Sequence, residues 1–224
     1  MNRVIFDIET LAFPFESLET RQQEYLMKFA KTEEEKAEVL LKLNLTPFTA
    51  QIIAVGMLNP ESNRGKVFYQ GPGEELSQSD DGLIDLVPCA EKEILEEFWT
   101  SLNHYSQFIT FNGRSFDCPF LMLRSAMLGI KPTRNLLPYR YNTHEHCDLM
   151  EQLTFYGAFR KFNLDFYCKA FGIKSPKSEG LTGLDLGSLF RAGKYREIAE
   201  YCIGDVRATG ELFHRWLSFL AFEK

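Results

Sequence analysis

The chain has 224 residues, a hydrophobic fraction of 45% and a formal net charge of −6 at pH 7. This length allows a single domain with a substantial core, which we expect to span residues 1–224. No apolar run approaches the roughly 18 residues that a membrane-spanning helix requires, and charge enters at Asp7 before a signal-peptide core can form. The five cysteines are scattered, which indicates reduced thiols in a cytoplasmic protein. We expect no membrane partner.

The first half of the chain predicts strands and one helical insertion. The expected first strand is Arg3–Glu9. Residues 14–45 form the insertion, which is leucine-rich and has helical periodicity. Its place between the first two strands fits a lid, a substrate clamp or a dimer surface. The other elements expected here are strands at Ala50–Leu58 and Lys66–Gln70 and a loop at Gly71–Pro88.

The second half of the chain predicts mostly helices. The last helix is long, and its expected core stripe consists of Cys202, Val206, Phe213, Trp216, Leu217 and Leu220. The expected elements of this half are a helix at Glu91–Leu102, a strand at Gln107–Phe111, helices at Phe116–Leu128 and Asn163–Phe171, a loop at 173–183, and helices at Leu184–Gly193 and Tyr195–Phe219.

Two acidic residues stand at the end of the first strand. Asp7 and Glu9 are two residues apart, so their side chains point to the same face, and Phe6 and Ile8 take the opposite one. The apolar residues before them indicate a buried strand whose end becomes acidic. The same spacing also occurs in ordinary half-exposed strands, so this pair acquires meaning only together with other acids.

Two later segments supply further acids and a tyrosine. Asp117 follows the apolar run Phe108–Phe111 and the turn Asn112–Gly113, and it opens a helix. Taken alone, it also fits a first-turn aspartate that the helix dipole favours. Tyr201 and Asp205 lie four residues apart in a helical segment, so they share one face. Aspartate is a poor helix former away from the N-terminus, which makes a purely structural Asp205 harder to explain.

Each of these carboxylates adjoins a hydrophobic run, where a charge is costly unless something compensates it. Hard divalent cations prefer oxygen ligands, and two of them side by side can clamp a phosphodiester for attack by water. We therefore expect Asp7, Glu9, Asp117 and Asp205 to hold two Mg²⁺ or Mn²⁺ ions.

The three segments resemble the ExoI, ExoII and ExoIII motifs of the DEDD 3′–5′ exonucleases, in the DEDDy subclass. The matching residues are Asp7 and Glu9 for D-x-E, Asn112, Phe116 and Asp117 for N-x3-F-D, and Tyr201 and Asp205 for Y-x3-D. Between the last two motifs, KFNLDFYCKAFGIKSPK followed by GLDLGSLFRAGKYREIAEYCIGD resembles bacterial stand-alone proteins related to the proofreading domain of B-family DNA polymerases. The resemblance covers most of the chain but not residues 14–45.

This resemblance implies an α/β, ribonuclease H-like fold, with a mixed central β-sheet flanked by helices and a helical insertion after the first strand. It also implies a metal-dependent 3′–5′ exonuclease that releases nucleoside 5′-monophosphates. Tyr201 is expected to orient the attacking water, because a phenol with a reference pKa of about 10 is a poor general base at neutral pH. The expected partner is single-stranded nucleic acid, with DNA favoured over RNA. The substrate contacts that we expect are Thr10, Asn112, Phe116, Lys174 and Lys177.

Two other functions stay open at this stage. One is an exoribonuclease that trims RNA by the same chemistry and differs in how it treats the 2′-hydroxyl group. The other is a nucleic-acid-binding module whose metal site is structural, although the intact acids and tyrosine argue against it.

The distribution of charge partly reconciles a negative chain with a polyanionic substrate. Residues 74–97 contain nine acids and one lysine, whereas residues 114–177 contain ten basic residues and five acids. A basic surface beside an acidic metal centre suits nucleic acid, and a solvated mixed surface is the alternative.

Two further groups of residues have both functional and structural interpretations. Residues 144–148 contain histidine, cysteine and acids but lack a partner pair elsewhere, and we interpret Asp148 as a helix N-cap that can still lie near the metals. Phe13, Phe15 and Phe48 can stack on bases, or pack in the core.

Overall fold

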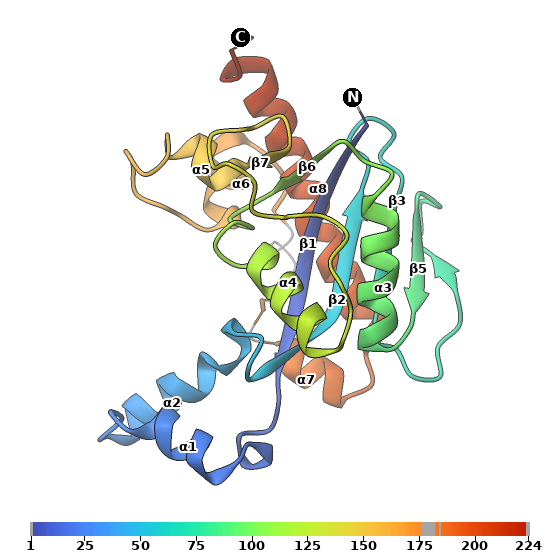
Figure 1. Ribbon diagram of the computed structural model, residues 1–224. Coiled ribbons are helices and arrows are strands. Elements are labelled where there is room, and N and C mark those ends of the chain that lie inside the picture. Colours follow the sequence, from blue (N-terminus) through green and yellow to red (C-terminus); the bar gives the residue numbers. More distant parts are fainter. Residues whose placement is uncertain (1, 176–181, 184, 223–224) are drawn as a thin grey trace.

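A mixed seven-stranded β-sheet runs through the centre of the protein, and helices cover its two faces (Figure 1). The computed structural model describes residues 2–175, 182–183 and 185–222. The strands lie in the order β4-β5-β3-β2-β1-β6-β7. They are β1 (Arg3–Ala12), β2 (Ala50–Leu58), β3 (Gly65–Tyr69), β4 (Ser77–Gln78), β5 (Ile84–Pro88), β6 (Gln107–Thr110) and β7 (His146–Asp148).

Alternating side chains of β1 contribute to two hydrophobic cores. Ile5 packs in one core with residues of the last helix, including Val206. Phe6 and Ile8 pack in the other core, where the ring of Phe6 meets that of Phe98 edge to face at 5.2 Å. The helices are α1 (Thr20–Met27), α2 (Glu33–Leu41), α3 (Glu91–Leu102), α4 (Asp117–Met127), α5 (Leu149–Leu153), α6 (Leu164–Phe171), α7 (Leu186–Arg191) and α8 (Tyr195–Phe219).

The carboxyl ends of β1, β6 and β7 point the same way, because these three strands are parallel. β6 pairs with β1 only along Arg3–Ile5, so it ends beside the point where β1 becomes acidic. On its other side β1 pairs with β2 in the antiparallel sense, and the register shifts between Glu9 and Thr10. Such bulges bend a strand locally and re-aim its side chains.

Most expected elements are confirmed, and three details are wrong. Residues 176–181 of the expected loop at 173–183, and Leu184 at the expected start of the next helix, lie outside the described residues. Gly71–Pro88 is not a loop, because it contains β4 and β5. The glycines, serines and acids of this segment are typical of a loop, although Ile84 and Leu86 are buried in the short strand β5. β7 was not predicted, since three residues are too few to show a period. Leu217, expected in the core stripe of the last helix, is 39% exposed.

The insertion projects from the body of the protein as two short helices, α1 and α2, which have no buried residues (Figure 1). α2 begins with a capping box, in which Thr32 accepts from the N–H of Glu35 and the Glu35 side chain accepts in return. The insertion is anchored where it rejoins the sheet, because Leu43 is buried and its carbonyl accepts a hydrogen bond from the Thr49 hydroxyl. Within the described residues, no helix combines the length and the apolar character needed to cross a membrane.

Candidate active site

The acidic end of β1 forms the centre of the candidate site. Asp7 and Glu9 lie on the sheet face that α8 covers, and Cys202 of α8 lies against them. One ligand atom from each of these three residues lies within 4.8 Å of the others. Glu9 is 8% exposed, so its carboxylate is largely removed from water. Two carboxylates this close in a partly buried place favour a bound cation.

The turn after β6 brings Asp117 to the same place. Asn112 adopts a left-handed conformation with φ of 64°. At Gly113 a Cβ atom would lie 2.5 Å from the Cβ of Thr110, so a residue with a side chain would clash there. The chain then enters α4, and Asp117 Oδ1 accepts a hydrogen bond of 3.1 Å from the backbone N–H of Ile8. This bond ties Asp117 to the strand segment between Asp7 and Glu9.

α8 approaches the acidic end of β1 closely because β2 has a glycine there. Gly56 pairs with Asp7 across the two strands. A Cβ atom at Gly56 would lie 2.8 Å from Val206 Cγ2 and 3.1 Å from Cys202 Sγ. The Cys202 thiol also lies 3.8 Å from the main-chain carbonyl of Asp7, to which it donates. The fit of α8 against Gly56 thus positions the helix that carries Tyr201 and Asp205.

The pKa values report how strongly these groups influence one another. Burial raises the pKa of Asp117 well above its ordinary value, and the carboxylates of Asp148 and Asp205 raise it further. Burial also raises the pKa of Tyr201, with added contributions from Asp205, Glu9 and Asp7. Asp205 of α8 therefore acts on Asp117 of α4, and the acids of β1 act on Tyr201 of α8, as groups gathered at one site do.

The donor set fits hard divalent cations. Four carboxylates offer oxygen ligands, which Mg²⁺ and Mn²⁺ prefer. Burial raises the pKa of Cys202 far above its ordinary value, and Glu9 and Asp7 raise it further. Cys202 therefore stays a neutral thiol at physiological pH and supplies no thiolate for a soft metal.

Asp148 supports the site from β7, and its predicted N-cap role is confirmed. Its side chain accepts from the N–H groups of Met150 and Glu151 at the start of α5. It also accepts from the N–H groups of Asn112 at 3.0 Å and Arg114 at 2.9 Å, which fixes the turn that leads to Asp117. No local pattern in the sequence indicates this second role, because the two segments are more than 30 residues apart.

His146 in the same segment is structural. It is 1% exposed, and its Nε2 lies 2.8 Å from the Thr110 hydroxyl. Burial lowers the pKa of His146 to about 3, and the positive charge of Arg114 contributes. The ring is therefore neutral at physiological pH.

The predicted substrate contacts lie in different surroundings. The Thr10 hydroxyl donates to the carbonyl of Asn44 at 2.8 Å, so it also anchors the insertion. Phe116 is partly buried against Phe120, whereas Lys174 is exposed. Lys177 lies outside the described residues. Roles in substrate binding for these residues and for Asn112 stay predictions.

The three phenylalanines considered for base stacking also differ. The Arg124 guanidinium lies 5.2 Å from the centre of the Phe13 ring. Phe15 is partly exposed, and Phe48 is 60% exposed. Phe48 is therefore the most accessible of the three to a ligand.

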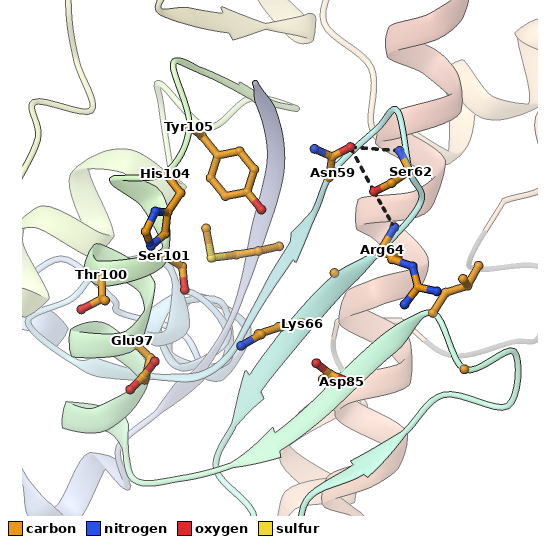
Figure 2. Close-up of a pocket in the computed structure, with 14 residues that line it drawn as sticks. Asn59, Ser62, Arg64, Lys66, Asp85, Glu97, Thr100, Ser101, His104 and Tyr105 are labelled. Carbon is orange, nitrogen blue, oxygen red and sulfur yellow. Dashed lines mark hydrogen bonds between the residues drawn. The ribbon is translucent and has the colours of Figure 1, made fainter. Parts of the chain in front are cut away.

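A separate cavity of about 530 Å³ lies on the opposite face of the sheet, between α3 and the β2–β3 hairpin (Figure 2). Lys66 pairs with Met57, which packs in the same core as Phe98 of α3. The Lys66 side chain points into the cavity, and Asp85 and Glu97 also line it. The sheet separates this cavity from the carboxylates of β1, so it is distinct from the candidate metal centre.

Comparisons with known proteins bear on the fold and on the family of this chain. A search of curated proteins found no significant match. Among solved structures, the family B DNA polymerase from the hyperthermophilic archaeon Pyrobaculum calidifontis matches with a TM-score of 0.62 and 16% identity, over 98% of this chain and 25% of the polymerase. The chain thus spans about a quarter of the polymerase's length, and at this identity the match supports the ribonuclease H-like fold.

A family model assigns the chain more specifically. The model is described as a predicted 3′–5′ exonuclease related to the exonuclease domain of PolB, and it matches residues 75–222. This range is well over half of the chain and includes Asp117, Tyr201 and Asp205, although β1 lies outside it. The chain therefore belongs to this family of predicted 3′–5′ exonucleases related to the exonuclease domain of PolB.

Proposed function

We propose that the protein is a two-metal-dependent 3′–5′ exonuclease of the DEDDy type. It hydrolyses phosphodiester bonds from the 3′ end of single-stranded DNA and releases nucleoside 5′-monophosphates. The observation that supports this most directly is the hydrogen bond from Ile8 N–H to Asp117, which joins α4 to the acidic end of β1. The effects of Asp205 on the pKa of Asp117, and of Asp205, Glu9 and Asp7 on the pKa of Tyr201, support it as well.

In this proposal, Asp7, Glu9, Asp117 and Asp205 hold two Mg²⁺ or Mn²⁺ ions. When bound, the ions lower the pKa of an attacking water and stabilise the leaving 3′ oxygen. Tyr201 keeps its proton at neutral pH, because burial and the nearby acids raise its pKa. Its hydroxyl therefore orients the water by a hydrogen bond and does not act as a general base. Cys202, one residue along α8, contributes packing and a neutral thiol.

The preference for DNA rests on the kind of protein that this chain resembles. The matched solved structure is a DNA polymerase, and the family is related to a polymerase exonuclease domain. A single strand is favoured because Glu9 and Asp117 are buried, so a frayed or free 3′ end reaches the acids more easily than a duplex does. The second candidate is an exoribonuclease with the same catalytic residues. It differs from the first in accepting the 2′-hydroxyl group of an RNA substrate.

The direct test is the polarity of degradation. A single DNA strand labelled at its 5′ end should give a descending ladder in the presence of Mg²⁺ or Mn²⁺, and no products in EDTA. A bulky block at the 3′ terminus should slow the reaction strongly. Cleavage of a closed circular strand at a comparable rate would instead indicate an endonuclease. Parallel reactions on RNA of the same sequence decide between the two candidate substrates.

The same experiment also tests the alternative that the protein only binds nucleic acid and that its metal site is structural. Such a protein would retain the labelled strand without shortening it, with either metal present. Asp7→Asn is the matched control, because it removes one charge from the cluster and keeps the size of the side chain. Degradation that survives in Asp7→Asn would come from a contaminating nuclease.

A further inference from the structure

An exposed aromatic and basic surface lies next to the turn that leads to Asp117. Two loops form it, one before β7 and one between α5 and α6. We name it the aromatic platform, defined by Tyr139, Tyr141, Phe155, Phe159, Arg160 and Lys161. Its four rings are between 52% and 74% exposed. Single exposed apolar side chains are ordinary, but several side by side usually mark a binding surface.

The backbone that carries the platform is strained. Phe155 has φ of 49° and Tyr156 has φ of 58°, a left-handed conformation that bulky residues rarely adopt. The conformation leaves the Phe155 ring 56% exposed, so burial of that ring cannot explain why the strain persists. Strain of this kind is concentrated at sites that bind or act on a ligand.

The rings hold one another in place. Tyr141 lies 4.7 Å from Tyr156 between ring centres, and Tyr139 lies 5.6 Å from Tyr141. Phe155 and Phe159 meet edge to face at 5.9 Å. An edge-to-face pair leaves ring faces open, and a preorganised ring loses little entropy when a flat ligand stacks on it.

The charge of the platform suits a polyanion. Within the described part of the chain, Arg160 and Lys161 form no ion pair with a carboxylate, and the Arg160 guanidinium lies 5.1 Å from the Phe162 ring centre. The insertion also exposes aromatic rings, such as Tyr25 and Phe29, but residues 14–45 contain seven acids and five basic residues. Of these two aromatic surfaces, the platform is therefore the better match for phosphates.

Arg114 connects the platform to the candidate active site. Its backbone N–H donates to Asp148, which also accepts from Asn112 in the turn before Asp117. Its guanidinium donates to the Pro138 carbonyl at 2.6 Å, beside Tyr139. Arg114 therefore joins the turn before Asp117 to the loop that carries Tyr139.

We propose that the aromatic platform binds the nucleotides that precede the 3′ end of a single-stranded substrate. Bases stack on the exposed rings of Tyr139, Phe155 and Phe159, while Arg160 and Lys161 contact phosphates. This inference rests on the proposed function, because it assumes that the 3′ end lies at the carboxylates. Stacking accepts every base, so the platform favours strand length over sequence.

The test measures strand binding without catalysis and then hydrolysis as a function of length. Fluorescence anisotropy in EDTA, with labelled single DNA strands of up to about 16 nucleotides, should show that Phe159→Ala and Tyr139→Ala each weaken binding about 5- to 150-fold. Arg160→Ala should lower the salt dependence of binding, with a slope smaller by about 0.7. The matched control is Phe29→Ala on the insertion, which removes a ring that is 79% exposed and should change neither quantity.

With metal present, the platform variants should raise KM for long strands and leave hydrolysis of a dinucleotide unchanged. Equal losses on both substrates, or unchanged binding of long strands, would overturn the inference. If the parent protein binds long strands in EDTA but degrades none of them with metal, the proposed function fails while the platform stands.

Phe155→Gly separates binding from a structural role. Glycine adopts the left-handed conformation without strain, so the thermal midpoint of unfolding should not fall. Strand binding should nevertheless weaken, because the ring is gone. A variant that loses stability and keeps full affinity would make Phe155 a structural residue and overturn its place in the platform.

Discussion

Tyr201 and Asp205 lie on one face of α8, and their surroundings predict different roles. Tyr201 is 8% exposed, and its raised pKa keeps the hydroxyl protonated. Asp205 raises the pKa values of Asp117 and Tyr201, which indicates a charged group close to both. A protonated phenol can donate to water, whereas a carboxylate can ligate a cation.

Substitutions at these two positions should therefore have separable effects. Tyr201→Phe keeps the ring and its packing but removes one hydrogen bond, so turnover should fall about 10²- to 10⁴-fold while metal binding persists. Asp205→Ala removes a proposed ligand, so it should abolish measurable turnover and weaken Mn²⁺ binding. Calorimetric Mn²⁺ titration of both variants beside their rates checks this. Full activity in Tyr201→Phe would return Tyr201 to a purely structural role.

Asp117 should make the metal-free protein less stable as pH rises. Its pKa in the folded state is raised to about 7, chiefly by burial. The folded state therefore holds this proton more tightly than the unfolded state, whose aspartate pKa is about 3.9. The stabilising contribution is complete below about pH 4 and is lost as pH rises towards 7.

Urea unfolding in EDTA across this pH range measures the effect. Asp117→Asn keeps an oxygen for the Ile8 N–H and cannot titrate, so it should flatten the slope. Asp80→Asn is the control for the loss of one carboxylate, since the Asp80 side chain is fully exposed. An unaltered slope in Asp117→Asn would mean that other groups control the pH dependence.

At the scale of elements, the fit of α8 against β2 determines where the helix with Tyr201 and Asp205 lies. Gly56 sits opposite Asp7, and a methyl group there would meet Val206 and Cys202. Gly210, further along α8, also faces the sheet. A Cβ atom there would lie 3.1 Å from Ile5 Cδ1 and 3.7 Å from Leu58 Cδ2, which are the far ends of flexible side chains. Gly210→Ala is therefore a matched control for Gly56→Ala.

Gly56→Ala should displace α8 and lower the free energy of unfolding by about 1–3 kcal/mol, as overpacking does. Turnover should fall as well, because Tyr201 and Asp205 move with the helix. Gly210→Ala should cost less stability and leave the rate near that of the parent. Denaturant unfolding and rates for both variants check this. Equal behaviour of the two would mean that the close contact at Gly56 does not position the site.

At the scale of the whole molecule, the proposed metal centre links three distant segments of the chain. β1, α4 and α8 contribute acids that repel one another without a cation. A cation that binds only the folded state therefore stabilises the entire fold. The single domain over residues 1–224 stays a prediction, and a single unfolding transition would agree with it.

Mn²⁺ should raise the thermal midpoint of the parent protein, with a gain of about 2.7 kcal/mol at a hundredfold excess over the dissociation constant. Asp7→Asn should reduce this gain, and without metal it should be at least as stable as the parent, because one repulsive charge is gone. Differential scanning calorimetry with and without Mn²⁺ measures both. No shift in the parent protein would rule out the metal centre.

Much of the local structure was decided by the sequence itself. Ala50–Leu58, Glu91–Leu102 and Tyr195–Phe219 have the predicted bounds. The strand is an almost continuous apolar run, and the two helices carry a helical hydrophobic period. Asp205 stands out for a local reason, because aspartate is a poor helix former away from the N-terminus. The other acids and the tyrosine acquire meaning only together, from their order along the chain. β4, β5 and β7 were missed because they are short and depend on pairing with neighbouring strands.

Only the tertiary structure decided how these elements meet. Gly56 admits α8, Asp148 fixes the turn before Asp117, and Arg114 joins that turn to the aromatic platform. Each of these contacts joins residues that are more than 20 positions apart, so no local period encodes them. The sequence determined which side chains could perform the chemistry. Packing of the chain determined that the candidate catalytic side chains stand together, because convergence depends on contacts between segments that are distant in the sequence.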